Sequence, residues 1–160
     1  MKRLLLSLLV VLLSFGFVAC GSTPAENNSN NPGETLFNKD SKGLVIGGYD
    51  AVAYFKDSKA VKGDAQHKLE WSGATWHFSS AANRDEFKAN PEKYAPQYGS
   101  YCAWAMARNE KANIDPNSWK IVDGKLYLNY DKKIQGLWEA DIPGFIKKAD
   151  GFWPTHSSKK

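Results

Sequence analysis

The sequence is poor in the side chains that hold metals, form disulfides or act as nucleophiles. Its 160 residues include two cysteines, three histidines and two methionines. The metalloprotease motif His-Glu-x-x-His and the nucleophile motif Gly-x-Ser-x-Gly are both missing, and so is a glycine-rich phosphate loop. Because no motif names a substrate, the sequence favours a binding protein over an enzyme.

A strong excess of positive charge is missing as well. The formal net charge is +4, but residues 1–19 contribute Lys2 and Arg3 and no acidic side chain. Without those two, 19 basic side chains stand against 17 acidic ones. This balance excludes the basic surface of a nucleic-acid-binding protein. The length fits one domain, and 42% hydrophobic residues suffice for a packed core.

The first twenty residues have the pattern of an export signal. Two basic residues precede an apolar run of sixteen residues, Leu4 to Ala19. A spanning helix needs about 20 apolar residues, so a secretory signal is favoured over an anchor helix. The run ends in Phe17-Val-Ala-Cys20, which resembles the lipobox of bacterial lipoproteins. The resemblance implies that Cys20 is lipidated; the alternative is an ordinary cleaved signal peptide.

Residues 20–35 lack large apolar side chains and are expected to form a flexible tether. Lipid on Cys20 would make the membrane a partner, and Gly21 after the cysteine implies the outer membrane, facing the periplasm, in a Gram-negative host. We therefore expect a signal peptide at 1–19, a lipidated tether at 20–35, a globular domain at 36–155 and a tail at 156–160.

A β-hairpin is predicted at residues 67–78, with Ser72-Gly73 as a two-residue loop. This register places His67 opposite Phe78. Side chains alternate along a strand, so His67 would face inward and His77 outward. The residues predicted to share the buried face are His67, Leu69, Trp71, Ala74, Trp76 and Phe78.

A second hairpin is predicted at residues 119–130 around Asp123-Gly124, with Trp119, Ile121, Leu126, Leu128 and Tyr130 on one face. Short helices are predicted over 51–55, after Ser80, from Pro91, over 99–106, after Asp131 and over 145–149, the last preceded by a break at Pro143-Gly144. The fold class is therefore α+β, a single small domain with two hairpins and several short helices.

Several strings resemble the YHS domain: Trp71-Ser-Gly-Ala-Thr-Trp-His-Phe-Ser-Ser80, Asn83-Arg-Asp-Glu-Phe87 and Asn90-Pro-Glu-Lys-Tyr94. Three more, at 48–55, 94–103 and 121–130, resemble a branch of secreted or lipid-anchored bacterial proteins with this domain. The resemblance covers nearly all of residues 43–154.

The resemblance implies a metal-binding module, with copper ahead of zinc, that serves sensing, storage or delivery. A protein that donates or accepts the metal would then be a partner. Short members of the family carry two cysteines, which would fall at Ser79 and Asn83. Both are replaced here, so a metal site must use other ligands.

Cys102 is the only thiol left if Cys20 is lipidated, so no internal disulfide can form. It is either a small buried residue beside Ala103 or a soft ligand for Cu(I) or Zn(II), or an activated thiolate. In a helix over 100–107, Met106 would lie on the same face as Cys102. A methionine at this spacing is more often core than ligand.

His67 is the preferred imidazole ligand, because His77 is predicted to face solvent and His156 lies in the tail. The alternative is a hydrogen-bonded histidine at the edge of the core. Tyr49 and Asp50 occupy a glycine-framed turn. Asp50 either caps the following helix, with Tyr49 packing, or one of the two supplies an oxygen ligand to a site with His67 and Cys102.

Three functions remain open. The first is a membrane-anchored module that binds a metal ion through Cys102 and His67. The second is a Cys-dependent enzyme or redox protein built on the same two residues. The third is a metal-free module that uses an aromatic pocket for a small molecule or a partner protein.

Overall fold

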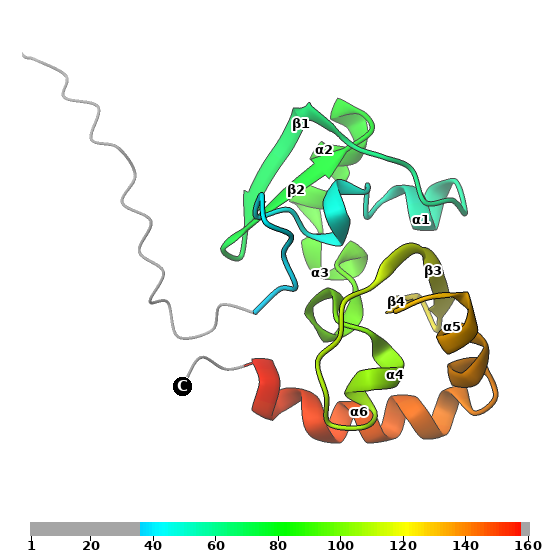
Figure 1. Cartoon of the computed structure of the whole chain (residues 1–160). Helices are drawn as coiled ribbons and strands as arrows, with labels where there is room; N and C mark the ends of the chain where they lie inside the picture. Colours follow the sequence, from blue (N-terminus) through cyan, green and yellow to red (C-terminus); the bar gives the residue numbers. More distant parts are fainter. Residues whose placement is uncertain (1–35, 158–160) are drawn as a thin grey trace, which may run out of the picture.

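Two antiparallel hairpins and a set of short helices make up residues 36–157, the part of the chain that the computed structural model describes (Figure 1). The elements in chain order are the 3₁₀ helix η1 (Ile46–Gly48), α1 (Ala53–Lys56), β1 (Asp64–Trp71), β2 (Ala74–Phe78), α2 (Ala81–Ala89), α3 (Pro91–Tyr94), the 3₁₀ helix η2 (Gln97–Ser100), α4 (Ala103–Met106), β3 (Asp115–Val122), β4 (Lys125–Asn129), α5 (Lys132–Glu139) and α6 (Ile142–Ser157). The predicted α+β class with two hairpins is confirmed. The expected signal peptide, Cys20 and the tether lie outside the described residues.

The first hairpin, β1 with β2, forms around the predicted turn, and the pairs next to that turn follow the predicted register. The prediction that His67 faces Phe78 is wrong, because Asp64 occupies that position. The ladder shifts register between Asp64 and Lys68, so residues 65–67 bulge out of it. His67 is half-buried as a result.

The second hairpin, β3 with β4, keeps the predicted register from its turn as far as the Trp119–Leu128 pair. Its strand β4 is buried on both faces, which the sequence pattern did not indicate. Leu126 and Leu128 belong to one hydrophobic cluster and Tyr127 to another. Tyr130, predicted to share a face with Leu126 and Leu128, lies beyond the end of β4 at Asn129 and is 55% exposed.

The predicted helix caps are present. The Ser80 hydroxyl accepts a hydrogen bond from the backbone N–H of Asn83 at 3.1 Å. Asp131 caps α5 in the same way, accepting from the N–H of Ile134 at 2.7 Å. Each cap satisfies one N–H that has no partner within its helix.

The last helix differs from the prediction. We expected Pro143-Gly144 to break the chain before Phe145, but α6 begins at Ile142 and runs through both residues. Proline is tolerated in the first turn of a helix because its missing N–H has no intrahelical acceptor there. The helix extends to Ser157 and thus includes His156, whose Nε2 lies 2.8 Å from Oδ1 of Asn109.

The predicted helix over 99–106 is only partly present, because η2 and α4 are separate. Tyr98, Gly99 and Ser100 have φ values of 55°, 57° and 65°. This left-handed run cannot belong to a right-handed α-helix. Cys102 follows it and precedes the single turn of α4, where Met106 donates its N–H to the Cys102 carbonyl at 2.9 Å.

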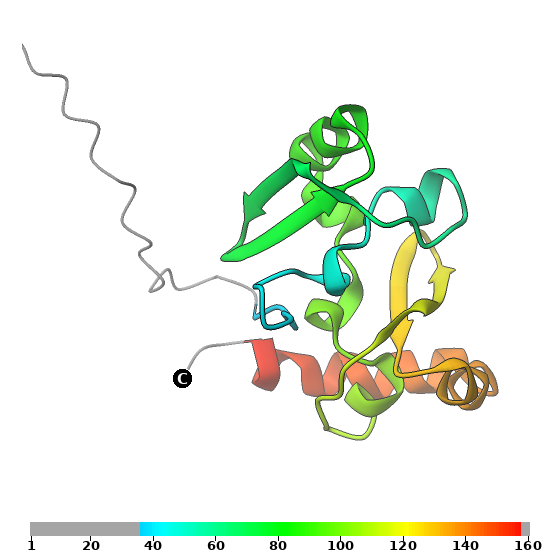
Figure 2. The ribbon, with the colours of Figure 1, turned by 45° about the horizontal axis from the view of Figure 1, so that its top comes forward.

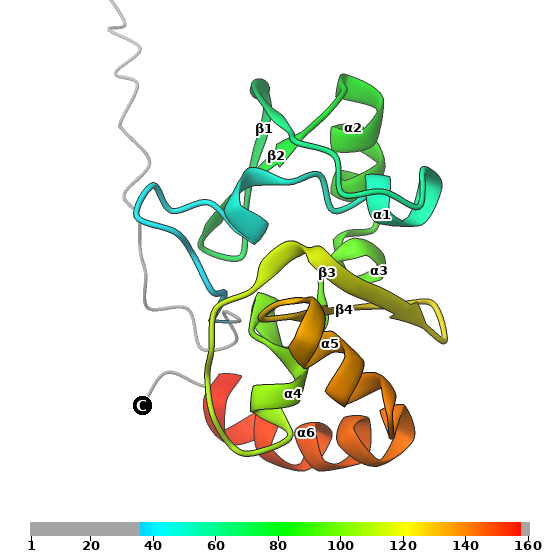
Figure 3. The ribbon, with the colours of Figure 1, turned by 45° about the vertical axis from the view of Figure 1, so that its right-hand side comes forward.

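The core consists of two clusters that meet at β4. The first cluster joins β1, β2 and α2 to the segment 37–54, and the second joins α4, α5 and α6. In Figures 2 and 3 the second hairpin lies between these two groups of elements. No helix within residues 36–157 combines the length and apolar character needed to cross a bilayer.

Candidate functional site

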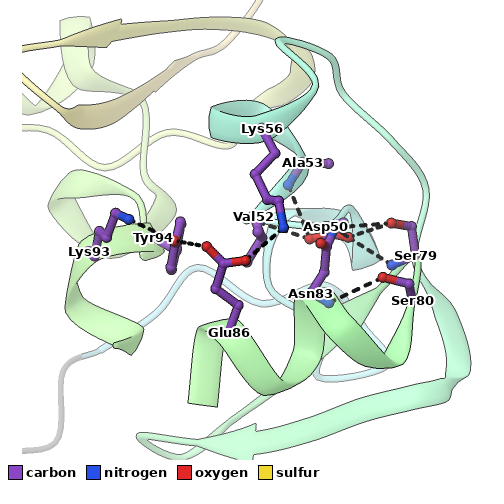
Figure 4. A network of polar contacts seen from close by, with 10 residues as sticks. All are labelled: Asp50, Val52, Ala53, Lys56, Ser79, Ser80, Asn83, Glu86, Lys93 and Tyr94. Carbon is purple, nitrogen blue, oxygen red and sulfur yellow. Dashed lines mark hydrogen bonds and ion pairs between the residues drawn. The ribbon is translucent and has the colours of Figure 1, made fainter. Parts of the chain in front are cut away.

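A fully buried carboxylate, Asp50, lies at the junction of η1, α1, β2 and α2 (Figure 4). Its Oδ1 accepts hydrogen bonds from the N–H groups of Val52 at 2.9 Å and Ala53 at 3.3 Å. Its Oδ2 accepts from the N–H of Ser79 at 2.8 Å, the hydroxyl of Ser79 at 2.6 Å and Nδ2 of Asn83 at 2.8 Å. Asp50 thus binds two N–H groups at the start of α1, although the N-cap position of that helix is Val52. The contacts to Ser79 and Asn83 were not predicted.

This arrangement uses the hydrogen-bonding capacity of Asp50 fully. An ionised carboxylate has about four lone-pair sites, and five donors surround this one. Hydrogen bonds to a charged acceptor are roughly twice as strong as neutral ones, which makes burial of the charge tolerable. No lone pair is left for a metal ion, so Asp50 does not fit the role of an oxygen ligand.

The positions that the family resemblance gives to two cysteines are therefore occupied by a hydrogen-bonded cluster. Asn83 Nδ2 also lies 3.3 Å from the Ser79 hydroxyl, so the two side chains hold each other as well as Asp50. The sequence drew attention to Ser79 and Asn83 only because the family's two cysteines are replaced there, so the cluster itself was not predicted.

A second polar network, next to the first in Figure 4, ties α1, α2 and α3 together. Lys56 Nζ lies 2.7 Å from Glu86 Oε2, and Tyr94 donates its hydroxyl to the other oxygen of Glu86. Lys93 Nζ donates to the Tyr94 hydroxyl at 2.8 Å. The hydrogen bonds from Lys56 and Tyr94 lower the pKa of Glu86. Both members of the ion pair are partly exposed, so the network contributes little to stability.

Cys102 lies in the other half of the domain and is fully buried. Its Sγ is 3.8 Å from Oδ1 of Asn129, which is also fully buried. Burial raises the pKa of the Cys102 thiol, although the backbone N–H groups of Ala105, Tyr130 and Trp104 act in the opposite direction. The thiol is therefore protonated at neutral pH and is not an activated nucleophile.

Three buried polar atoms in this half have no hydrogen-bond partner among the described residues: Ser100 Oγ, Asn129 Nδ2 and Trp138 Nε1. One of them belongs to a side chain in contact with the thiol, since Asn129 contacts its sulfur through Oδ1. Ser100 precedes Cys102 by two residues in the chain. Ser100 also has the positive φ of the left-handed run. Unpaired buried polar groups and strained backbone are both costly, and they gather at functional sites. Asn129 was not predicted, because nothing in the sequence distinguishes this asparagine from others.

The structure does not bring the predicted metal ligands together. His67 lies on β1, and Figures 1 and 3 show β1 at the opposite end of the molecule from α4, the helix that Cys102 directly precedes. Met106 is buried within the second hydrophobic cluster, and Tyr49 is half-buried with Lys62 Nζ 4.7 Å from its ring centroid. Within residues 36–157 no three His, Cys, Asp or Glu side chains are grouped to hold a metal ion. The residues present do not fit a four-ligand zinc centre.

A surface cleft that includes one aromatic side chain is present, and Cys102 is not among its lining residues. It has a volume of about 470 Å³ and lies where α2 meets α3. Its lining residues are Trp71, Ala89, Asn90, Pro91, Glu92 and Lys93. Trp71 is its single aromatic side chain, and the aromatic residues of β2, Trp76 and Phe78, fill the core.

Comparison with known proteins identifies part of this chain. Residues 52–98 match the YHS domain. No match was found among curated proteins or among solved structures. The YHS domain therefore spans α1 to η2, and it contains Ser79 and Asn83 but neither Asp50 nor Cys102.

Proposed function

We propose that this chain is an exported binding module, built on the YHS domain of residues 52–98 and held at a membrane by lipid on Cys20. In a Gram-negative host it would face the periplasm from the outer membrane. Its ligand site is the buried polar cluster formed by Cys102 and Asn129. The observation that carries the site is the unpartnered Nδ2 of Asn129, a side chain whose Oδ1 lies 3.8 Å from the buried thiol.

A metal ion is the ligand class that the YHS domain favours, because this small module is often linked to metal binding. Copper is favoured over zinc, since a single buried thiol suits a soft ion such as Cu(I) better than Zn(II), which requires four ligands. Sensing, storage or delivery would follow, with a donor or acceptor protein as partner. Of the two metal ligands expected from sequence, Cys102 and His67, only Cys102 belongs to this site.

A metal-free small ligand is the second candidate, and the unpartnered donors favour it. Asn129 Nδ2 needs a hydrogen-bond acceptor, which a metal ion does not provide. A Cys-dependent enzyme receives less support, because its thiolate would need a neighbouring base and burial keeps the Cys102 thiol protonated.

The test is metal binding by the full chain in detergent, purified under reducing conditions. Metal content is measured by mass spectrometry, and Cu(I) and Zn(II) are then titrated against a competing chelator. We expect Cys102→Ser to weaken copper binding at least tenfold and His67→Ala to leave it unchanged, with His77→Ala as the matched control on the same hairpin. A loss confined to His67→Ala would move the site to β1, and no binding at all would leave the metal-free ligand.

A further inference from the structure

The five donors around Asp50 form a cradle with the geometry of a carboxylate-binding site. The backbone N–H groups of residues 52 and 53 donate to one oxygen. The other oxygen accepts from three donors, which are the N–H and hydroxyl of Ser79 and Nδ2 of Asn83. The donors come from three separate parts of the chain, and Figure 4 shows them converging on one carboxylate.

No cation takes part in this cradle. The ion pairs within the described residues are Lys56–Glu86, Arg84–Asp85 and Lys120–Glu139, and none includes Asp50. A buried anion without a counter-ion is stable only where dipoles replace its hydration shell. The cradle thus recognises the carboxylate by hydrogen bonds alone, as a site for a small organic anion would.

Asp50 reaches the cradle on a strained turn. Ile46, Gly47 and Gly48 have φ values of 54°, 58° and 77°. A left-handed conformation is a genuine outlier for a β-branched residue such as Ile46. Beyond this run, the Asp50 N–H donates to the Val61 carbonyl at 2.9 Å. The contacts of the carboxylate offset the strain of the turn that carries it.

We infer that the YHS half of this protein is built around an internal carboxylate-binding site, and that Asp50 is its tethered ligand. Asp50 lies just before the matched YHS segment, while the donors belong to that segment. The site is separate from the Cys102 cluster and does not rest on the proposed function. Every donor in it is an N–H or O–H group of the chain.

The test is chemical rescue. Asp50→Gly removes the tethered carboxylate and leaves room for formate, which carries the same group. The full chain in detergent is unfolded in urea and refolded with sodium formate or with sodium chloride at equal ionic strength. Asp131→Gly is the matched control, because it removes a half-buried capping carboxylate for which one donor, the N–H of Ile134, is present among the described residues.

We expect Asp50→Gly to lower the urea midpoint strongly, and formate to raise it in a saturable way that chloride does not reproduce. At formate concentrations 100 times the dissociation constant, the ratio of folded to unfolded chain should rise about 100-fold. Neither Asp131→Gly nor the double variant Asp50→Gly/Ser79→Ala should respond in this way. If Asp50→Gly fails to fold, recovery of near-ultraviolet dichroism on refolding in formate is the same positive result.

Three outcomes would overturn the inference. They are an Asp50→Gly chain as stable as the parent, a formate effect no larger than that of chloride, and an equal effect on Asp131→Gly. None of these results bears on copper binding at Cys102, so the two proposals fail separately.

Discussion

The YHS segment 52–98 should not fold without the chain on either side of it. Besides Ala51, its hydrophobic cluster includes five large side chains from outside the segment, namely Phe37, Val45, Ile46, Leu126 and Leu128. Four of them are at most 1% exposed, and Phe37 is 7% exposed. Burying a side chain of this kind contributes about 1.5–3 kcal/mol, so the five together contribute about 8–15 kcal/mol.

That contribution is as large as the whole stability of a typical domain, about 5–15 kcal/mol. The extended-chain reference overstates burial by roughly 10–40%, and the remainder still decides the result. The segment also loses Asp50, which leaves the donors of Ser79 and Asn83 without their acceptor. We therefore expect residues 52–98 to be unfolded in isolation.

The assay compares the isolated segment with the full chain by urea unfolding and by amide dispersion in a proton–nitrogen correlation spectrum. The full chain should unfold cooperatively, and the segment should show neither a transition nor dispersed amides. Leu128→Ala in the full chain measures one of the missing contacts and should cost about 2–5 kcal/mol. A cooperative transition in the isolated segment would refute the reasoning, because it would show that the flanking side chains are not required.

Three further predictions follow from the structure. In a Cys20→Ser chain, iodoacetamide should alkylate Cys102 at least about 10³-fold more slowly in native buffer than in urea. The buried thiol reacts only after an opening of the fold that costs about 5 kcal/mol. Equal rates in the two conditions would contradict its burial. Gly136→Ala should stabilise the chain by about 0.5–1 kcal/mol, since the new Cβ has nothing within 4 Å. Gly63→Ala should destabilise it by about 1–3 kcal/mol, since its Cβ would lie 2.5 Å from the His77 carbonyl carbon. Urea midpoints of the two variants check both signs. Burial raises the pKa of Tyr127 from 10.0 to about 12, so its contribution to stability is complete below pH 10.0 and is lost as the pH rises towards 12. The unfolding free energy, measured from about pH 8 to about pH 11, should therefore fall above pH 10. A flat profile would show that Tyr127 ionises equally in the folded and unfolded states.

The local features of this fold could be predicted because each depends on a few neighbouring residues. Asp123-Gly124 fixes a two-residue turn, and that turn fixes the register of β3 and β4. Ser80 and Asp131 stand directly before the helices that they cap. The bulge before Lys68 could not be predicted, because the alternation of β1 continues past the point where its register with β2 shifts.

The candidate sites depend on contacts that no local pattern contains. Asp50 is 29 residues from Ser79 and 33 from Asn83, and only the packing of α2 against the turn brings them together. Asn129 is likewise 27 residues from Cys102. The sequence identified Cys102 by elimination, as the one thiol in the globular part, but it gave no reason to choose Asn129 over His67 as its neighbour.

The two buried acids of this domain differ in what a ligand could still do. The Asp50 oxygens are saturated by donors, so a ligand can enter that cradle only by replacing Asp50. The Cys102 thiol is kept neutral by burial and therefore still carries a proton that a ligand can displace. A metal ion binds thiolate and must release that proton, whereas a neutral hydrogen-bonding ligand leaves it in place. Proton release measured in weakly buffered solution thus separates the two candidates for this site: about one proton per bound ion indicates a metal, and none indicates a ligand held by Asn129.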